Sequence, residues 1–467
     1  MQLSQFVTDY DESLLGDTYI DPLGVLVIWS AFGGHVFRNR VNSISNDVRN
    51  YTLNLMNHRI IRDLIDDDSV VVSRALENAI GDKHSLSFRQ ACLIYLENLF
   101  LYSLISAESR AGVETGGILG GSKGRKVFEE SKGSPKLMLS HTKDAHLLVR
   151  QLSLGVGGRY KTPFMEIGFF DTHSHYHLPE ADGLWARADQ LFQSSGRLRA
   201  VYDTVRAHLA SLINVGTTTA SSPPSYSFAD VPLSLKKAYQ DAYASPGRVG
   251  AETRAFWLEL TGLDHGAAGA LLHELDKHAT DADEVPLEDE QVFRLAEKRC
   301  NKLGDDGAAS MIQHILTLEP LLAEVDLLFT LSLHRRNQRM AEVETLWREM
   351  GRDETTLPKL AGRIREFSSL IGAIKGTARA RLEQLLQVAS LETLEEQLRA
   401  LLEYHAGVMR SRGQFPWVAA KSADLIQVEA RTQPLPDKDK RAPGHWVNHY
   451  YLPQFRNLVD GFRGVPA

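Results

Sequence analysis

The sequence predicts a mainly α, multidomain helical protein with a small α+β, glycine-rich segment in its middle. Apolar residues make up 43% of the 467 residues and charged residues 24%. These values are typical of globular chains and exclude a fibrous repeat or a bundle of membrane helices. Apolar residues recur at helical spacing near both ends of the chain, whereas glycines crowd between residues 112 and 158. About three domains are expected at this length.

Residues 1–110 are predicted to form a helical domain. Apolar side chains at helical spacing indicate one helix over 45–64 and another over 87–106. The segment is acidic, with nine Lys or Arg against fourteen Asp or Glu.

Residues 111–216 are predicted to form a glycine-rich, basic α+β segment. Short apolar runs at 137–139 and 164–170 predict strands, so we expect strands to concentrate between 111 and 232. Residues 111–161 carry nine Lys or Arg against four Asp or Glu, although the whole chain has a net charge of −7. This stretch is therefore locally cationic.

The remainder is predicted to be helical after a linker. Ser, Thr and Pro dominate 217–232, which is typical of a linker. Residues 233–431 are predicted to form a helical bundle domain, with long helices over 316–350 and 378–409. Residues 432–467 form an aromatic C-terminal tail.

A cytoplasmic location is expected. Cys92 and Cys300 are too few for a disulfide framework, and the acidic N-terminus lacks the basic region of a secretory signal peptide. The longest uncharged apolar stretch, 22–37, is shorter than the roughly 20 residues that a membrane helix needs. No membrane span is predicted.

The basic glycine-rich segment is the candidate contact for nucleic acid. Glycines let a backbone approach phosphates closely, and Lys or Arg neutralise them. The cations expected to do so are Lys123, Arg125, Lys126, Arg159 and Lys161. Residues 116–124 imitate a phosphate-binding loop, but the serine precedes the lysine, which is the wrong order for a nucleotide site.

The aromatic tail is the candidate contact for other protein subunits. It carries Trp446, Tyr450, Tyr451 and Phe455. Trp and Tyr are favoured at the centres of protein interfaces.

A metal site is an alternative interpretation. In an extended strand, Asp171, His173 and His175 share one face, and two imidazoles with a carboxylate can hold Zn or Mn. Asp171-Thr172-His173-Ser174-His175 resembles the first metal motif of the amidohydrolase family, and Gly216-Thr217-Thr218-Thr219 resembles a second short element of it. The resemblance implies a metal-dependent hydrolase on a (β/α)₈ barrel, with further His and Asp ligands at later strand ends. The chain after residue 232 instead predicts helices.

A helical nuclease is a second alternative. The Arg399 to His405 spacing, Arg-x5-His, resembles the Arg and His pair of HEPN-family ribonucleases. His405 also falls on an apolar seam with Leu394, Leu398 and Leu401, which is typical of a core histidine in a packed helical hairpin.

The predicted function is a non-catalytic structural or adaptor subunit of a multiprotein assembly. A nucleic-acid-directed assembly, such as a prokaryotic antiviral defence or restriction system, suits the local basic segment. No cofactor is expected for such a subunit, and Zn or Mn belongs to the hydrolase alternative alone.

Overall fold

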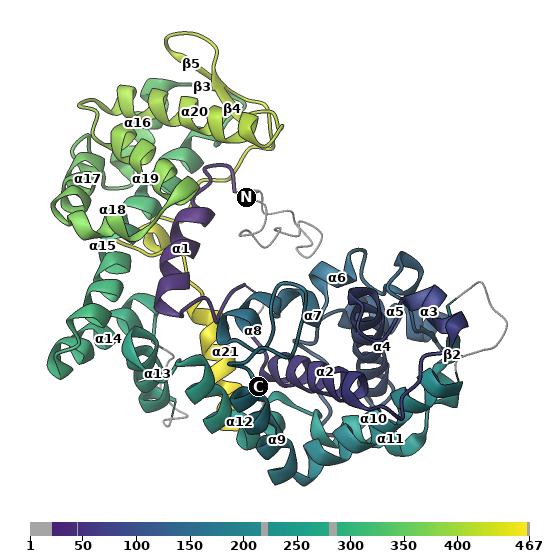
Figure 1. The fold of residues 1–467 in the computed structure, drawn as a ribbon. Helices are drawn as coiled ribbons and strands as arrows, with labels where there is room; N and C mark the ends of the chain where they lie inside the picture. The colour runs from purple at the N-terminus through teal and green to yellow at the C-terminus, as the bar shows by residue number, and fades with distance from the viewer. Residues whose placement is uncertain (1–20, 44, 216–222, 280–286, 465–467) are drawn as a thin grey trace. The chain divides into compact units, whose positions relative to one another are not determined.

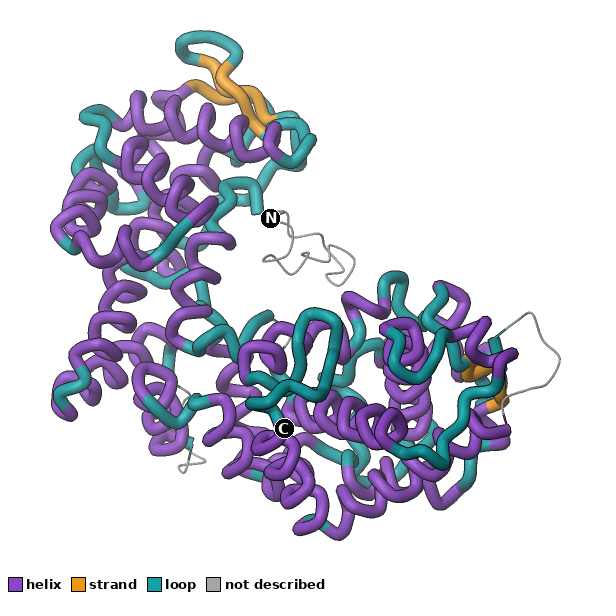
Figure 2. The backbone as a smooth tube through the Cα atoms, viewed as in Figure 1, coloured by secondary structure: helices purple, strands orange, loops and turns teal. Residues whose placement is uncertain are grey.

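The computed structural model describes residues 21–43, 45–215, 223–279 and 287–464. Helices account for 64% of these residues, with a few small antiparallel sheets (Figure 1 and Figure 2). The predicted mainly α fold is therefore confirmed. Residues 216–222, which include Gly216-Thr217-Thr218-Thr219 and the start of the expected linker, lie outside the described residues.

The chain divides into two compact units, and each is built from two separate stretches. Unit 1 comprises Met1–Asn42 and Leu263–Leu452, and unit 2 comprises Ser43–Gly262 and Pro453–Ala467. The five segments predicted from the sequence stay a prediction, because compactness alone does not test their boundaries.

Unit 2 is organised around α2 (Val48–Asp66), in which fifteen of nineteen residues are buried. It packs against α4, α7, α10 and α12. The other helices of this unit are α3 (Arg74–Ile80), α4 (Leu86–Ile105), α5 (Gly121–Glu130), α6 (Gln151–Leu154), α7 (Val156–Arg159), α8 (Lys161–Ile167), α9 (Asp182–Ser194), α10 (Gly196–Val215), α11 (Leu233–Ala242), α12 (Pro246–Thr261) and α21 (Leu452–Arg463). The predicted helices over 45–64 and 87–106 correspond to α2 and α4.

A two-stranded antiparallel sheet completes unit 2. Strand β1 (Lys136–Met138) pairs with β2 (Ser225–Ser227), with Leu137 opposite Tyr226. The strand predicted over 164–170 is wrong, because α8 occupies most of this run and ends at Gly168, whose φ is +105°. A short helix buries such an apolar run as well as a strand does.

Unit 1 is organised around α15 (Asp306–Ser332), in which eighteen of 27 residues are buried. It packs against α1, α14 and α17. The other helices are α1 (Leu26–Val36), α13 (Gly266–His278), α14 (Asp289–Leu303), α16 (Met340–Glu349), α17 (Thr356–Glu366), α18 (Ser368–Ala373), α19 (Gly376–Ala389) and α20 (Leu394–Ser411). No helix in the described ranges is long and apolar enough to cross a membrane.

Unit 1 also contains a three-stranded antiparallel sheet in the order β3-β5-β4. Its strands are β3 (Asn337–Arg339), β4 (Val418–Ala420) and β5 (Leu425–Val428). The expectation that strands concentrate between 111 and 232 is thus wrong, because this sheet lies beyond that range. The two long helices predicted in this part of the chain are each interrupted, by β3 and by the N-cap Thr393.

Candidate functional site

The first glycine cluster, residues 116–124, is held in place by a buried ion pair. Arg49 is fully buried, and its Nη2 lies 2.6 Å from Asp47 Oδ2. The same guanidinium donates hydrogen bonds to the carbonyl oxygens of Glu114 and Gly116. A Cβ on Gly117, whose φ is +76°, would lie 2.7 Å from Asp47 Oδ2. The loop before α5 is therefore fixed by the protein itself.

Helix α5 presents part of the predicted nucleic-acid surface. Its first residue follows Gly120, which has a left-handed backbone and supplies no side-chain cap. Lys123 and Lys126 are exposed, whereas Arg125 is half-buried and pairs with Glu108 at 2.8 Å. Lys132, two residues after the helix, and Lys136, the first residue of β1, are also exposed.

The remaining two predicted cations do not join this surface. Arg159 is only 9% exposed, and its Nε donates to the carbonyl oxygen of Leu154 at 3.1 Å. Lys161 is half-buried, and its Nζ donates to the carbonyl oxygen of Thr172 at 2.5 Å. The structure therefore splits the five predicted contact residues into two groups.

The second glycine cluster, residues 155–158, packs against a buried carboxyl group. The N–H of Gly157 donates to Glu97 Oε1 at 2.6 Å, and Gln151 Nε2 donates to Glu97 Oε2 at 3.0 Å. Burial raises the pKa of Glu97 to about 7, although these hydrogen bonds offset part of the shift. A Cβ on Gly155 would collide with Glu97 Oε2, so this position requires glycine.

The histidine segment is a turn and not the extended strand that the metal interpretation assumed. Asp171 Oδ1 accepts hydrogen bonds from the backbone N–H groups of His173 and His175 at 2.8 and 2.9 Å. Its Oδ2 lies 2.8 Å from His175 Nδ1. Burial raises the pKa of Asp171, but the hydrogen bonds from His175 outweigh it, so the pKa lies below its usual value. Ser174, with φ of +58°, makes the reversal.

Two of the three proposed metal ligands, Asp171 and His175, are therefore engaged with each other. Asp171 serves as the cap of the turn, and the ring centroids of His173 and His175 are 5.8 Å apart. In the part of the chain that the structure describes, no group of three His, Cys, Asp or Glu side chains could hold a metal ion. Nothing in this geometry supports a Zn or Mn site at Asp171, His173 and His175.

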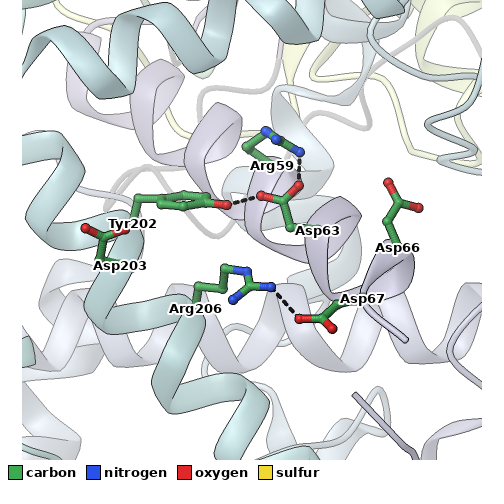
Figure 3. A pocket seen from close by; sticks show the side chains of 7 residues that line it. All are labelled: Arg59, Asp63, Asp66, Asp67, Tyr202, Asp203 and Arg206. Carbon is green, nitrogen blue, oxygen red and sulfur yellow. Dashed lines mark hydrogen bonds and ion pairs between the residues drawn. The ribbon is translucent and has the colours of Figure 1, made fainter. Parts of the chain in front are cut away.

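A broad groove of about 490 Å³ lies between α2 and α10 (Figure 3). It is lined by Arg59, Asp63, Asp66, Asp67, Tyr202, Asp203 and Arg206. Figure 3 shows Asp63 between Arg59 and the Tyr202 hydroxyl, and Asp67 facing Arg206.

Most charges of this groove are paired, although its four Asp residues outnumber its two Arg residues. Arg59 Nε lies 2.5 Å from Asp189 Oδ1 on α9, and Arg206 Nη2 lies 2.5 Å from Asp67 Oδ2. Asp66 is 2.9 Å from His177 Nε2. These ion pairs hold α2 against α9 and α10, and Asp63 also accepts a hydrogen bond from the Tyr202 hydroxyl. Burial raises the pKa of Asp63.

The Arg399 and His405 pair is not assembled. His405 is fully buried, its Nδ1 lies 2.8 Å from the carbonyl oxygen of Pro22, and its Nε2 accepts from the Trp417 N–H at 2.9 Å. Burial lowers the pKa of His405. Arg399 pairs with Glu395 at 2.8 Å on the solvent side of α20. His405 is a neutral core histidine that joins three segments of unit 1.

The aromatic tail is anchored inside the protein. Glu319 of α15 accepts hydrogen bonds from the Val447 and Asn448 N–H groups and, at 2.7 Å, from the Tyr450 hydroxyl. Tyr450 and Phe455 are fully buried. Trp446 and Tyr451 keep partial exposure but contact the rings of Phe293 and Trp29 respectively. Of the four predicted contact residues, Trp446 and Tyr451 alone retain surface that a partner could reach.

Two features were missed from the sequence. Phe415 is 91% exposed, the highest value among the large apolar residues in the described ranges. Arg89 lies on the same face of α4 as Leu93 and Glu97, at positions i, i+4 and i+8, and is only 6% exposed. The helical spacing of Arg89 and Glu97 could have signalled a buried polar face.

Comparisons with protein-family models, with curated proteins and with solved structures found no match to this chain. Its function is therefore inferred from the geometry of the chain itself.

Proposed function

We propose that this protein is a cytoplasmic, non-catalytic adaptor subunit that contacts nucleic acid through exposed lysines of α5 and the residues after it. It would serve a nucleic-acid-directed assembly of the prokaryotic antiviral defence or restriction type, together with other protein subunits. The observation that carries the proposal is the exposed cationic surface on a loop and helix that the buried Arg49 and Asp47 pair holds in place.

The protein itself does not neutralise most of the positive charge on this surface. Among the described residues, Lys123, Lys132 and Lys136 have no ion-pair partner, and Lys126 has only a distant one, Glu130 at 4.0 Å. Unpaired exposed lysines on a fixed backbone can neutralise successive phosphates. Because base-reading side chains do not accompany them, the proposed contact is independent of sequence.

A measurement of duplex binding against salt concentration tests this part. The double variant Lys123→Ala/Lys126→Ala should weaken binding and reduce the slope of log K against log salt by about 0.7–0.9 for each phosphate that is no longer neutralised. The matched control is Lys298→Ala/Lys302→Ala, which removes the same charge from α14. Equal binding by all three proteins, or none at low salt, would refute the nucleic-acid contact.

The contact with partner subunits is supported by a different residue. Phe415, 91% exposed, precedes β4 in a loop with Gln414 and Pro416. Exposed aromatic side chains of this kind are enriched at interface centres. The isolated protein should therefore self-associate as its concentration rises.

Light scattering during gel filtration tests the partner contact. Phe415→Ser should reduce self-association, whereas Leu303→Ser, which changes another apolar residue of unit 1 that is 67% exposed, should not. A monomer at all concentrations that Phe415→Ser leaves unchanged would count against an adaptor role for this surface.

A further inference from the structure

A small cavity of about 50 Å³ lies inside unit 2, away from the exposed surface of α5. It is bounded by α2, α4, α6, α7, α8 and the turn formed by residues 171–175, here called the histidine turn. Its polar lining includes His58, Arg89, Glu97, Gln151, Lys161 and Ser174. The cavity thus brings together the second glycine cluster, the histidine turn and the buried polar face of α4.

Arg89 carries a buried charge without an anionic partner. The residue is 6% exposed, its Nη1 donates to the carbonyl oxygen of His173 at 3.3 Å, and its Cζ lies 5.9 Å from the ring centroid of Tyr176. No carboxylate of the described residues forms an ion pair with it. Buried guanidinium groups are normally neutralised by a neighbouring anion.

The carboxyl group that lines this cavity, Glu97, is already engaged elsewhere. Both oxygens of Glu97 accept hydrogen bonds, one from the Gly157 N–H and one from Gln151. Asp171, beside Lys161, is likewise held by His175 and by two backbone N–H groups. Neither carboxyl group therefore serves as a counter-ion for Arg89.

A second cation and an imidazole line the same cavity. Burial lowers the pKa of Lys161, although Asp171 opposes the shift. His58 Nδ1 lies 2.9 Å from the Tyr176 hydroxyl, while its buried Nε2 has no partner in the described chain. Burial and the charge of Lys161 lower the pKa of His58 to about 3, so the imidazole is neutral.

The apolar residues that line the cavity indicate what the rest of the ligand should be. Leu86 and Leu152 are 39% and 36% exposed, and Leu93 lies one helical turn after Arg89. Apolar walls favour an anion with a hydrocarbon part, and the Glu97 carboxyl group disfavours a dianion. A cavity of this size also excludes a nucleotide.

We propose that this cavity is a binding site for a small monocarboxylate, whose carboxylate pairs with Arg89 and Lys161 and whose short apolar chain contacts Leu93 and Leu152. Charge-assisted hydrogen bonds from a guanidinium suit a carboxylate best, since both groups are planar.

Isothermal titration of the full-length protein with sodium propionate tests the site, with sodium phosphate and sodium chloride as parallel titrants at equal ionic strength. Propionate should bind saturably and chloride should not. Arg89→Met should weaken propionate binding by at least about tenfold, as expected for a lost charge-assisted hydrogen bond. Lys161→Met should weaken it less, because Lys161 is only half-buried.

Two further variants keep the test decisive if Arg89→Met does not fold. Leu152→Trp should block the cavity without changing its charge, whereas Lys237→Met removes an exposed cation of α11 and should bind propionate like the parent protein. Absence of saturable propionate binding, tighter binding of phosphate, or unchanged affinity of both Lys161→Met and Leu152→Trp would overturn the proposal.

Discussion

The two glycine clusters of unit 2, 116–124 and 155–158, both precede or begin a helix, yet their surroundings differ. A Cβ on Gly116 would meet nothing within 4 Å, and the exposed Lys123 and Lys126 follow. A Cβ on Gly158 would collide with the carbonyl oxygen of Leu152, and this cluster packs on the buried Glu97. Both clusters contain glycines that pack closely against the protein, since a Cβ on Gly117 would lie 2.7 Å from Asp47 Oδ2. The difference is that the first cluster also has an open position, Gly116, and is followed by exposed cations.

The largest loss of stability should come from breaking the buried pair of Arg49 and Asp47, which holds the first glycine cluster. Arg49→Met leaves the carboxylate of Asp47, 2% exposed, buried without its partner. Removing one member of a buried pair costs about 3–5 kcal/mol, so the free energy of unfolding in urea should fall by that amount.

The control for this variant lies in the same region. Arg125→Met breaks the half-exposed pair with Glu108 and should cost only about 0.2–1 kcal/mol. Equal losses for the two variants would show that the loop before α5 does not depend on the buried pair.

The second cluster should make stability depend on pH through Glu97. Its pKa is about 7 in the folded protein, above the ordinary value of 4.5. The folded state therefore holds the proton more tightly, and the stability from this group is complete below pH 4.5 and lost as the pH rises through 7. The loss should be on the order of 3 kcal/mol. Urea unfolding of Glu97→Gln should lack this decline between pH 4.5 and 7.

His58 acts in the opposite direction over part of the same range. Its pKa of about 3 is lowered from 6.5, so its contribution is present above pH 6.5 and is lost as the pH falls towards 3. The parent protein and Glu97→Gln both contain His58. The difference between their free energies of unfolding therefore reports the Glu97 carboxyl group alone. A flat difference over this range would place Glu97 in a more polar environment than the structure shows.

The glycines themselves provide the most direct comparison of the two clusters. Gly158→Ala forces a Cβ against backbone and should cost about 1–3 kcal/mol by overpacking. Gly116→Ala, with open space around it, should change the stability by less than about 0.5 kcal/mol. Thermal unfolding of both variants checks the contrast, which fails if Gly116→Ala is the more damaging substitution.

Sequence periodicity located helices α2 and α4, but it missed the breaks inside the two longest predicted helices and the short elements. Helices α2 and α4 follow directly from apolar spacing, because each is one continuous stretch whose apolar side chains recur at helical intervals. The strands β3 and β5 are three and four residues long, and each is stabilised by a distant segment. A pairing of that kind leaves almost no periodic signal in either segment.

The predicted site residues show the same limit at the level of single side chains. Lys123 and Arg159 look equivalent in a basic, glycine-rich segment, but one is exposed and the other is buried. Asp171 and His175 alternate as a strand would, yet the carboxylate caps a turn. Burial and hydrogen bonding depend on contacts between distant segments, which composition and spacing do not contain.

The smallest expected effect concerns Lys123, and its sign separates a structural role from a binding role. Lys123 lies in the first turn of α5, where the positive end of the helix dipole disfavours a cation. Lys123→Ala should therefore raise the stability by about 0.3–1 kcal/mol at low ionic strength, and the gain should shrink as salt screens it. Urea unfolding at two salt concentrations measures it, with Lys132→Ala, beyond the end of the helix, as the matched control.

A loss of stability on replacing Lys123 would mean that the cation supports the fold. A gain would mean that a residue unfavourable to its own helix stands at the proposed phosphate contact, as expected where a side chain serves binding at some cost in stability.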